Sequence, residues 1–209
     1  VMTGCSASGT TADSTGYSAE NPLVLTLAHG LSETHTVHIA MTQFADEVAE
    51  KTDGRIQVKI FPNGQLGSEN ENLEQLQAGV IAMTKVSAPG LATYNDAFNT
   101  FGLPYIFNDT DDFYHVMDSQ EMQDFFLSTG DDGFVTLTYY TSGARSFYTK
   151  DRAIRTPADL KGLKIRVQDM KSQTDMMSYL GGIPVAMSYG DVYTSLQTGI
   201  IDGTENNET

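Results

Sequence analysis

Apolar and polar side chains follow two different periods along the first part of the chain. Residues 55–61 (RIQVKIF) alternate apolar with polar, the pattern of a strand with one buried face. Residues 36–52 carry apolar side chains at helical spacing, which predicts an amphipathic helix. The predicted elements are strand 23–28, helix 36–52, strand 55–61, helix 68–77 and strand 80–86. This order is typical of a parallel sheet covered by helices.

The second part of the chain is predicted to continue with short helices and strands. Residues 134–140 (FVTLTYY) are rich in β-branched and aromatic side chains, which favours a strand. The other predicted elements are helices 111–117, 121–128, 171–180 and 190–199 and strands 146–149, 163–167 and 183–186.

The stretch TPADLKGLKIRVQ, residues 156–168, combines a capped turn with a strand. Thr156 can cap a short helix, and Asp159 stands where a capping box has its acid. Gly162 suits the end of that turn, because glycine tolerates the left-handed conformation. The strand that follows places Arg166 on its polar face. A guanidinium matches a carboxylate with two parallel hydrogen bonds, although an arginine on a strand is also typical of a solvated surface.

Charge is unevenly distributed along the 209 residues, which have a net charge of -15. Residues 1–144 contain four of the twelve basic side chains, and residues 145–171 contain the other eight. The acidic balance argues against a nucleic-acid partner, because phosphate binding needs an excess of Lys and Arg. A cationic segment in an acidic protein suits the capture of a small anion. No apolar run approaches the ~20 residues that span a membrane.

Cys5 is the single cysteine, so the sequence predicts no intramolecular disulfide. It ends the stretch VMTGC, which resembles the last residues of a bacterial lipoprotein signal, where the cysteine is lipidated. A linker rich in Ser, Thr and Gly follows. We therefore expect an exported protein in which residues 1–21 form a lipid anchor and a flexible linker. The alternative is a stray thiol in a disordered tail.

Four segments carry a resemblance to a known family. They are GRIQVKIFPNGQLGSENENLEQLQAG, GLPYIF, ADLKGLKIRVQ and PVAMSYGDVYTSLQTGIIDGTEN, in that order. Together they resemble the solute-binding proteins of tripartite ATP-independent periplasmic (TRAP) transporters, of the dicarboxylate-binding type. The resemblance implies a binding protein without a cofactor. It would carry an organic anion, usually a carboxylate, to a membrane permease driven by a sodium gradient.

The resemblance also implies a fold and a domain organisation. We expect an α/β protein with a type II periplasmic-binding-protein-like fold, in which hinge strands join two domains around a ligand cleft. The family's chains continue for roughly a hundred further residues, so a C-terminal part is expected to be missing. The expected ranges are domain I over 22–141, domain II over 142–201, and a strand returning to domain I over 202–209.

Four ligand-binding residues are implied by the resemblance. Arg166, in KIRVQ, matches the family's carboxylate-binding arginine, and Arg145, in SGARSF, resembles a second, supporting arginine. Asn206, in DGTEN, resembles an asparagine that shares the carboxylate. Tyr189 stands where the family often places an aromatic ring against the ligand. The usual proline after DGxEN is replaced by Asn207.

Further candidates follow from the predicted sheet. Ligands bind at the carboxyl ends of parallel strands, which places His29, Glu33 and Ser87 near the cleft. Glu69, at the start of the next helix, is within reach of a ligand hydroxyl or amine. Helix capping or solvent exposure explains each of these residues equally well.

Two other functional classes remain as alternatives. His29, His35 and His38 lie close together in the sequence and suggest a transition-metal site, although no HExxH motif is present. An exported hydrolase would need paired acids, for which Glu69 and Glu71 are candidates. These two are two residues apart on a predicted helix and point away from each other, and no GxSxG motif is present.

Overall fold

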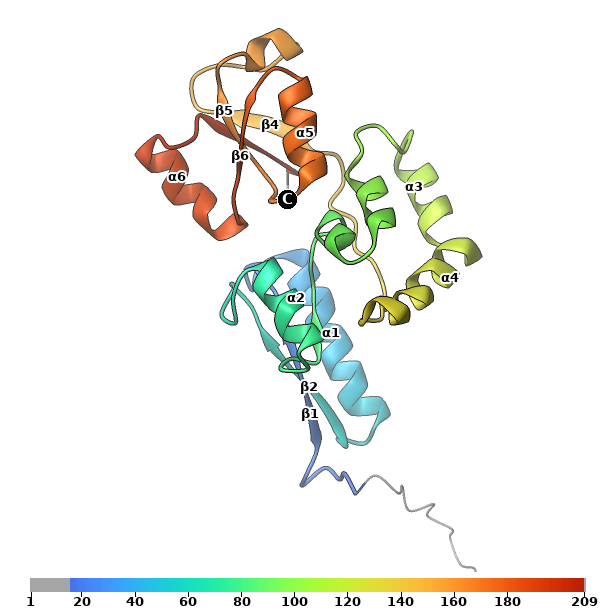
Figure 1. Ribbon diagram of the computed structural model, residues 1–209. Coiled ribbons are helices and arrows are strands. Elements are labelled where there is room, and N and C mark those ends of the chain that lie inside the picture. Colours follow the sequence, from blue (N-terminus) through green and yellow to red (C-terminus); the bar gives the residue numbers. More distant parts are fainter. Residues whose placement is uncertain (1–15, 209) are drawn as a thin grey trace, which may run out of the picture.

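Two separate β-sheets stand at the two ends of the computed structural model, which describes residues 16–208 (Figure 1). The first sheet has three parallel strands in the order β2-β1-β3. Its strands are β1 Leu23–Ala28, β2 Ile56–Phe61 and β3 Met83–Thr84. β1 pairs with β2 over its whole length, from Leu23 opposite Ile56 to Ala28 opposite Phe61.

Two helices, α1 Thr36–Lys51 and α2 Glu69–Gln77, connect the strands of the first sheet, and two more, α3 Thr110–Met117 and α4 Gln120–Ser128, follow its last strand. Short 3-10 helices lie at Ala88–Thr93, Asp96–Gly102 and Thr129–Asp132. The predicted capping box begins α2: Ser68 N and Oγ donate to Glu71 Oε2 at 2.7 and 2.8 Å. The elements from β1 to the 3-10 helix at Thr129–Asp132 are called the first unit below. Its buried core is formed by Leu73, Leu91, Phe98 and Phe134.

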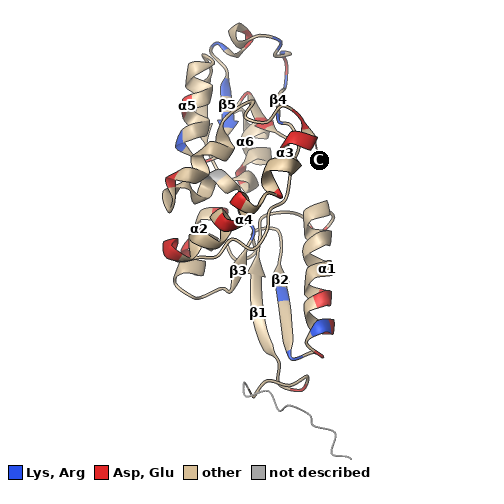
Figure 2. Cartoon of the chain, turned by 90° about the vertical axis from the view of Figure 1, so that its right-hand side faces the viewer, with Lys and Arg blue, Asp and Glu red and all other residues tan. Residues whose placement is uncertain are grey.

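The second sheet has four strands in the order β4-β7-β5-β6. Its elements are β4 Ser146–Thr149, β5 Lys164–Val167, β6 Ile183–Ala186 and β7 Gly203–Asn206, with α5 Lys171–Tyr179, α6 Val192–Thr198 and 3-10 helices at Pro157–Leu160 and Tyr189–Asp191. β5, β6 and β7 are parallel, and β4 runs antiparallel to β7. The elements from β4 to β7 are called the second unit below, and its core is Leu160, Ile165, Val167 and Met177. Lys and Arg gather on β5 and on the loop that joins β4 to it (Figure 2).

The predicted α/β class and most of the predicted elements are confirmed, with differences of one or two residues at their ends. Residues 202–209 were expected to form a strand that returns to the first unit. β7 instead lies inside the second sheet, bonded to β4 on one side and β5 on the other, so residues 203–206 belong to the second unit. The boundary between residues 141 and 142 stays a prediction.

Two predicted strands differ from the structure. Residues 134–140 are not in a strand, because a β-rich run becomes one only where a neighbouring backbone completes its hydrogen bonds. The third strand of the first sheet was predicted over residues 80–86 and spans only Met83–Thr84. Its pairing with β1 is limited to Met83 and Thr84, opposite Leu27 and Ala28.

Gly203 allows β7 to fit between its neighbours. A Cβ at this position would meet the backbone oxygen of Tyr148, with Thr149 Cγ2 at 2.8 Å and Ile165 Cδ1 at 3.1 Å. We therefore predict that Gly203→Ala lowers the free energy of unfolding by about 1–3 kcal/mol through overpacking. Urea unfolding followed by circular dichroism measures this. Gly190→Ala is the matched control, because a Cβ at Gly190 meets no atom within 4 Å. Equal effects of the two substitutions would contradict this packing argument.

Candidate functional site

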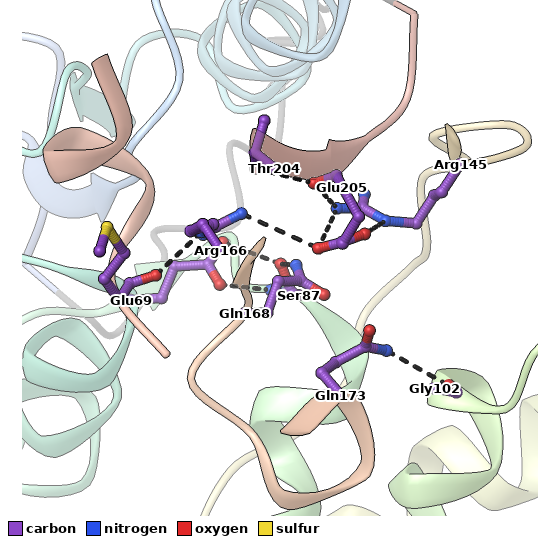
Figure 3. Close-up of polar contacts among 10 residues, drawn as sticks. Glu69, Ser87, Gly102, Arg145, Arg166, Gln168, Gln173, Thr204 and Glu205 are labelled. Carbon is purple, nitrogen blue, oxygen red and sulfur yellow. Dashed lines mark hydrogen bonds and ion pairs between the residues drawn. The ribbon is translucent and has the colours of Figure 1, made fainter. Parts of the chain in front are cut away.

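The two units meet through side chains that follow the carboxyl ends of their strands (Figure 3). Gln168, directly after β5, donates from Nε2 to Ser87 Oγ at 3.0 Å. Gln173 on α5 donates from its buried Nε2 to the backbone oxygen of Gly102 at 3.2 Å. Both bonds join residues more than seventy positions apart in the sequence. The carboxyl ends of the parallel strands therefore face each other, which is where α/β proteins bind ligands.

Arg166 lies in the second unit at this junction and is only 4% exposed. It occupies β5 opposite Val185 of β6 and Thr204 of β7. Its Nε donates to the backbone oxygen of Met187 at 3.1 Å, which fixes one edge of the guanidinium. Burial lowers the pKa of Arg166; Glu205 and Glu69 act in the opposite direction, and Arg145 adds to the lowering. The side chain is thus a buried cation surrounded by other charges.

Glu205 on β7 is the acidic partner that the sequence analysis missed. It is 3% exposed and receives hydrogen bonds from Arg145 Nε at 2.6 Å and Arg145 Nη2 at 3.1 Å. Its Oε1 also lies 3.9 Å from Arg166 Nη1. One buried carboxylate therefore stands between two guanidinium groups (Figure 3). The signal for it was an acid inside a short strand, next to the candidate Asn206.

Glu69 and Ser87 are brought together in the first unit, a contact that the sequence analysis did not anticipate. Glu69 Oε2 accepts a hydrogen bond from Ser87 N at 3.1 Å, and Oε1 accepts one from Ser87 Oγ at 3.2 Å. Lys85 Nζ lies 3.2 Å from Glu69 Oε1, an ion pair that the sequence analysis did not identify. Because Ser87 also receives the bond from Gln168, this cluster reaches the second unit.

Tyr189 and Asn206 lie near Arg166 in different ways. Tyr189 is 58% exposed at the start of a 3-10 helix and is close enough to Arg166 to influence its pKa. Asn206 is half-buried on β7, opposite Ser146 of β4. The ligand contacts expected of these two residues stay predictions.

His29 directly follows β1 and lies in the interior. Its side chain is fully buried, and its Nδ1 accepts a hydrogen bond from Leu31 N at 3.1 Å. Nδ1 therefore carries no proton, and the neutral ring donates from Nε2 to His38 Nδ1 at 3.0 Å. Thr42 Oγ1 lies 3.4 Å from His38 Nε2 and continues the chain of bonds. A ligand contact to His29, as the sequence analysis expected, would need one of these bonds to break.

The residues of the two alternative functions have other partners. His35 Nδ1 accepts a hydrogen bond from Val37 N and so caps α1 instead of facing His29. Within residues 16–208, no group of three His, Cys, Asp or Glu side chains is arranged to hold a metal ion. The acids of the hydrolase alternative separate: Glu71 bonds Ser68 at the helix cap, whereas Glu69 bonds Ser87.

Cys5 lies outside the described residues, so the lipid anchor stays a prediction. No helix in residues 16–208 is long and apolar enough to cross a membrane.

A cavity of about 910 Å³ also lies between the two units. Its wall includes Asn70 and Glu74 of α2 and Asp169 and Met170, which precede α5. Asn70 Nδ2 lies 3.5 Å from Asp169 Oδ2 and so bridges the units at this wall.

Comparisons with known proteins agree on one family. The family profile described as "Bacterial extracellular solute-binding protein, family 7" (DctP) matches residues 27–209. Protein YiiZ of Salmonella typhimurium, described as uncharacterized, is 42% identical, with 88% of this chain and 57% of YiiZ covered. The C4-dicarboxylate-binding periplasmic protein DctP of Rhodobacter capsulatus is 33% identical, with 88% and 56% covered. This chain thus spans little more than half the length of these relatives.

Solved structures give the same result. A TRAP periplasmic solute-binding protein from Anaerococcus prevotii with bound D-glucuronate has a TM-score of 0.86 and 39% identity, covering 89% of this chain and 61% of its own. One from Xanthobacter autotrophicus with bound β-D-galacturonate has a TM-score of 0.84 and 36% identity, covering 88% and 61%. These matches confirm the family resemblance and the fold class expected from the sequence.

The buried His29 predicts a loss of stability on acidification. Burial, followed by the charges of His38, Lys85 and His35, lowers the pKa of His29 from 6.5 to about 4. Between these values the unfolded chain binds more protons than the folded one, so the contribution is complete above pH 6.5 and lost as pH falls toward 4. From pH 7.5 to pH 5 the loss amounts to about 2 kcal/mol.

We expect His29→Gln to remove this component, so that its free energy of unfolding falls less between pH 7.5 and pH 5 than that of the wild type. Urea titrations at the two pH values measure the difference. His115→Gln, on the exposed side of α3, is the control and should retain the wild-type decrease. A His29→Gln decrease as large as that of the wild type would contradict the assignment.

Proposed function

Because the chain belongs to family 7 of the bacterial extracellular solute-binding proteins, we propose that it captures a small organic acid outside the cytoplasm and delivers it to a TRAP-type permease. Its matches among solved structures include TRAP periplasmic solute-binding proteins, and the role proposed here is binding without catalysis. Its ligand-binding residue in this proposal is Arg166, which takes the carboxylate of the acid.

The observation that supports this role most is the buried but incompletely paired guanidinium of Arg166. Its Nε is bonded to Met187 O at 3.1 Å, whereas Nη1 lies 3.9 Å from Glu205, beyond hydrogen-bond distance. The two terminal nitrogens of Arg166, Nη1 and Nη2, can therefore donate two parallel hydrogen bonds to one carboxylate. A buried cation without a well-placed partner is unfavourable, so an acid that binds here relieves part of the desolvation penalty.

Arg145 supports the ligand indirectly in this proposal. Its two hydrogen bonds to the side-chain oxygens of Glu205 hold that carboxylate in the interior, next to Arg166. Glu205 in turn limits how far the Arg166 guanidinium can turn. The two arginines and the single glutamate leave one positive charge in excess, which suits an anionic ligand.

The ligand class follows from the relatives with bound acids. Related solute-binding proteins are solved with D-glucuronate and β-D-galacturonate, which are sugar acids with one carboxylate. For this chain we infer a sugar acid of the same kind. The partly exposed ring of Tyr189 would lie against its carbon body, and Asn206 would share its carboxylate.

Delivery to a permease requires a location outside the cytoplasm. The curated relative from Rhodobacter capsulatus is periplasmic, and the same location is proposed here. Lipidation of Cys5 would attach the protein to the membrane through the linker that follows. Mass spectrometry of the protein purified from membranes, compared with a Cys5→Ser variant, tests this attachment.

Replacement of the proposed carboxylate ligand tests the function. We predict that Arg166→Ala weakens the binding of D-glucuronate by at least about tenfold, because loss of one partner of such a pair costs about 2–5 kcal/mol. Arg166→Lys keeps the charge and loses the two parallel bonds, so it should bind more weakly than the wild type. Isothermal titration calorimetry gives the three dissociation constants.

Arg152→Ala serves as the matched control, because Arg152 is exposed and its guanidinium donates to the backbone oxygen of Lys161, away from Arg166 in the sequence. It should bind D-glucuronate like the wild type. Circular dichroism verifies that each variant is folded. An unchanged affinity in folded Arg166→Ala would remove Arg166 from the site.

A further inference from the structure

The charges around Arg166 come from both units and do not cancel. Two cations and one anion belong to the second unit, namely Arg145, Arg166 and Glu205. The first unit adds the ion pair of Lys85 and Glu69, whose charge acts on Arg166 across the junction. Among these five side chains, positive charge exceeds negative charge by one. A ligand with a single negative charge therefore completes the balance, whereas a dianion exceeds it.

Three contacts fix the orientation of the Glu69 carboxylate at the junction between the two units. Ser87 N and Ser87 Oγ each donate a hydrogen bond to it, and Lys85 Nζ contacts Oε1 at 3.2 Å. The side chain is still 33% exposed. A carboxylate has about four acceptor positions, so after these three contacts Glu69 retains the capacity to accept from a ligand.

We propose that Glu69 is a specificity-determining residue that selects organic acids with one carboxylate and several hydroxyls over dicarboxylates. This inference rests on the proposed function, because it assumes that Arg166 takes the first carboxylate. With that group bound, the far end of the ligand meets the first unit. A hydroxyl there donates a hydrogen bond to Glu69, whereas a second carboxylate meets a fixed negative charge at short range.

The position of Lys85 explains why this selection requires Glu69 and not just any polar residue. If Glu69 were neutral, the ammonium of Lys85 would remain beside the ligand site and would attract a second carboxylate. Loss of the Glu69 charge therefore acts twice in favour of a dianion: it removes a repulsion and leaves a cation without its partner.

The test compares two acids in the wild type and in Glu69→Gln. Dissociation constants for D-glucuronate and L-malate are measured at pH 7.5, where L-malate is a dianion. We expect the wild type to prefer D-glucuronate. In Glu69→Gln the ratio of the L-malate constant to the D-glucuronate constant should fall by at least about tenfold, as expected for removal of a close like charge.

Two controls separate the charge from other effects. Glu74→Gln removes an acid from the same helix, α2, at a position that faces the 910 Å³ cavity, and should leave the ratio unchanged. Ser87→Ala loosens Glu69 and removes the bond to Gln168 but keeps the charge, so it should weaken both acids while changing their ratio less than Glu69→Gln does.

The outcomes distinguish this inference from the function on which it rests. An unchanged ratio in Glu69→Gln, or a wild type that prefers L-malate, overturns the role of Glu69 and leaves the capture of acids by Arg166 intact. Binding of neither acid to the folded wild type overturns both. The proposal is supported if this ratio decreases more in Glu69→Gln than in either control.

Discussion

A buried carboxylate between two arginines is the interaction on which the second unit is built. Glu205 reaches this position only because β7 lies between β4 and β5, where Gly203 permits close contact with both neighbours. Replacing the carboxylate by an apolar group would leave the buried guanidinium of Arg166 and the partly exposed one of Arg145 without the anion between them, at a high electrostatic cost. The short, well-aligned bonds from Arg145 offset the desolvation of Glu205, and the longer distance to Arg166 leaves that side chain ready for a further acid.

The local parts of this structure were readable from the sequence. Capping boxes at Ser68 and Thr156, and the alternation around Arg166, involve residues a few positions apart, so the pattern contains the whole interaction. The place of β7 was not readable, because its partners β4 and β5 are far from it in the sequence. The role of Glu205 depends on this long-range pairing, and that of Lys85 depends on its contact with Glu69 of α2; neither residue type indicates a buried or paired position on its own.

The three clustered histidines show how one spacing allows several kinds of chemistry. Their separation in the sequence agrees with a metal site, but the decisive property is the partner of each ring nitrogen. Leu31 N donates to His29 Nδ1, which sets the tautomer of His29. The remaining N–H of the ring, at Nε2, then donates to His38. His35 turns to the start of α1. Backbone groups near in the sequence, which no composition reveals, thus direct these rings toward a structural role.

The division of the site between two units has a consequence for binding. Arg166 is anchored in the second unit through Met187, and Glu69 is anchored in the first through Ser87. A ligand that touches both side chains therefore stabilises the arrangement in which Gln168 reaches Ser87, and separation of the units costs the ligand one of its two contacts. A ligand shifts a conformational equilibrium only by its difference in affinity for the two states. Part of the binding free energy would therefore stabilise the joined units relative to the separated ones. In the proposed function a carboxylate alone would bind one unit, whereas an acid with hydroxyls at its far end would join them.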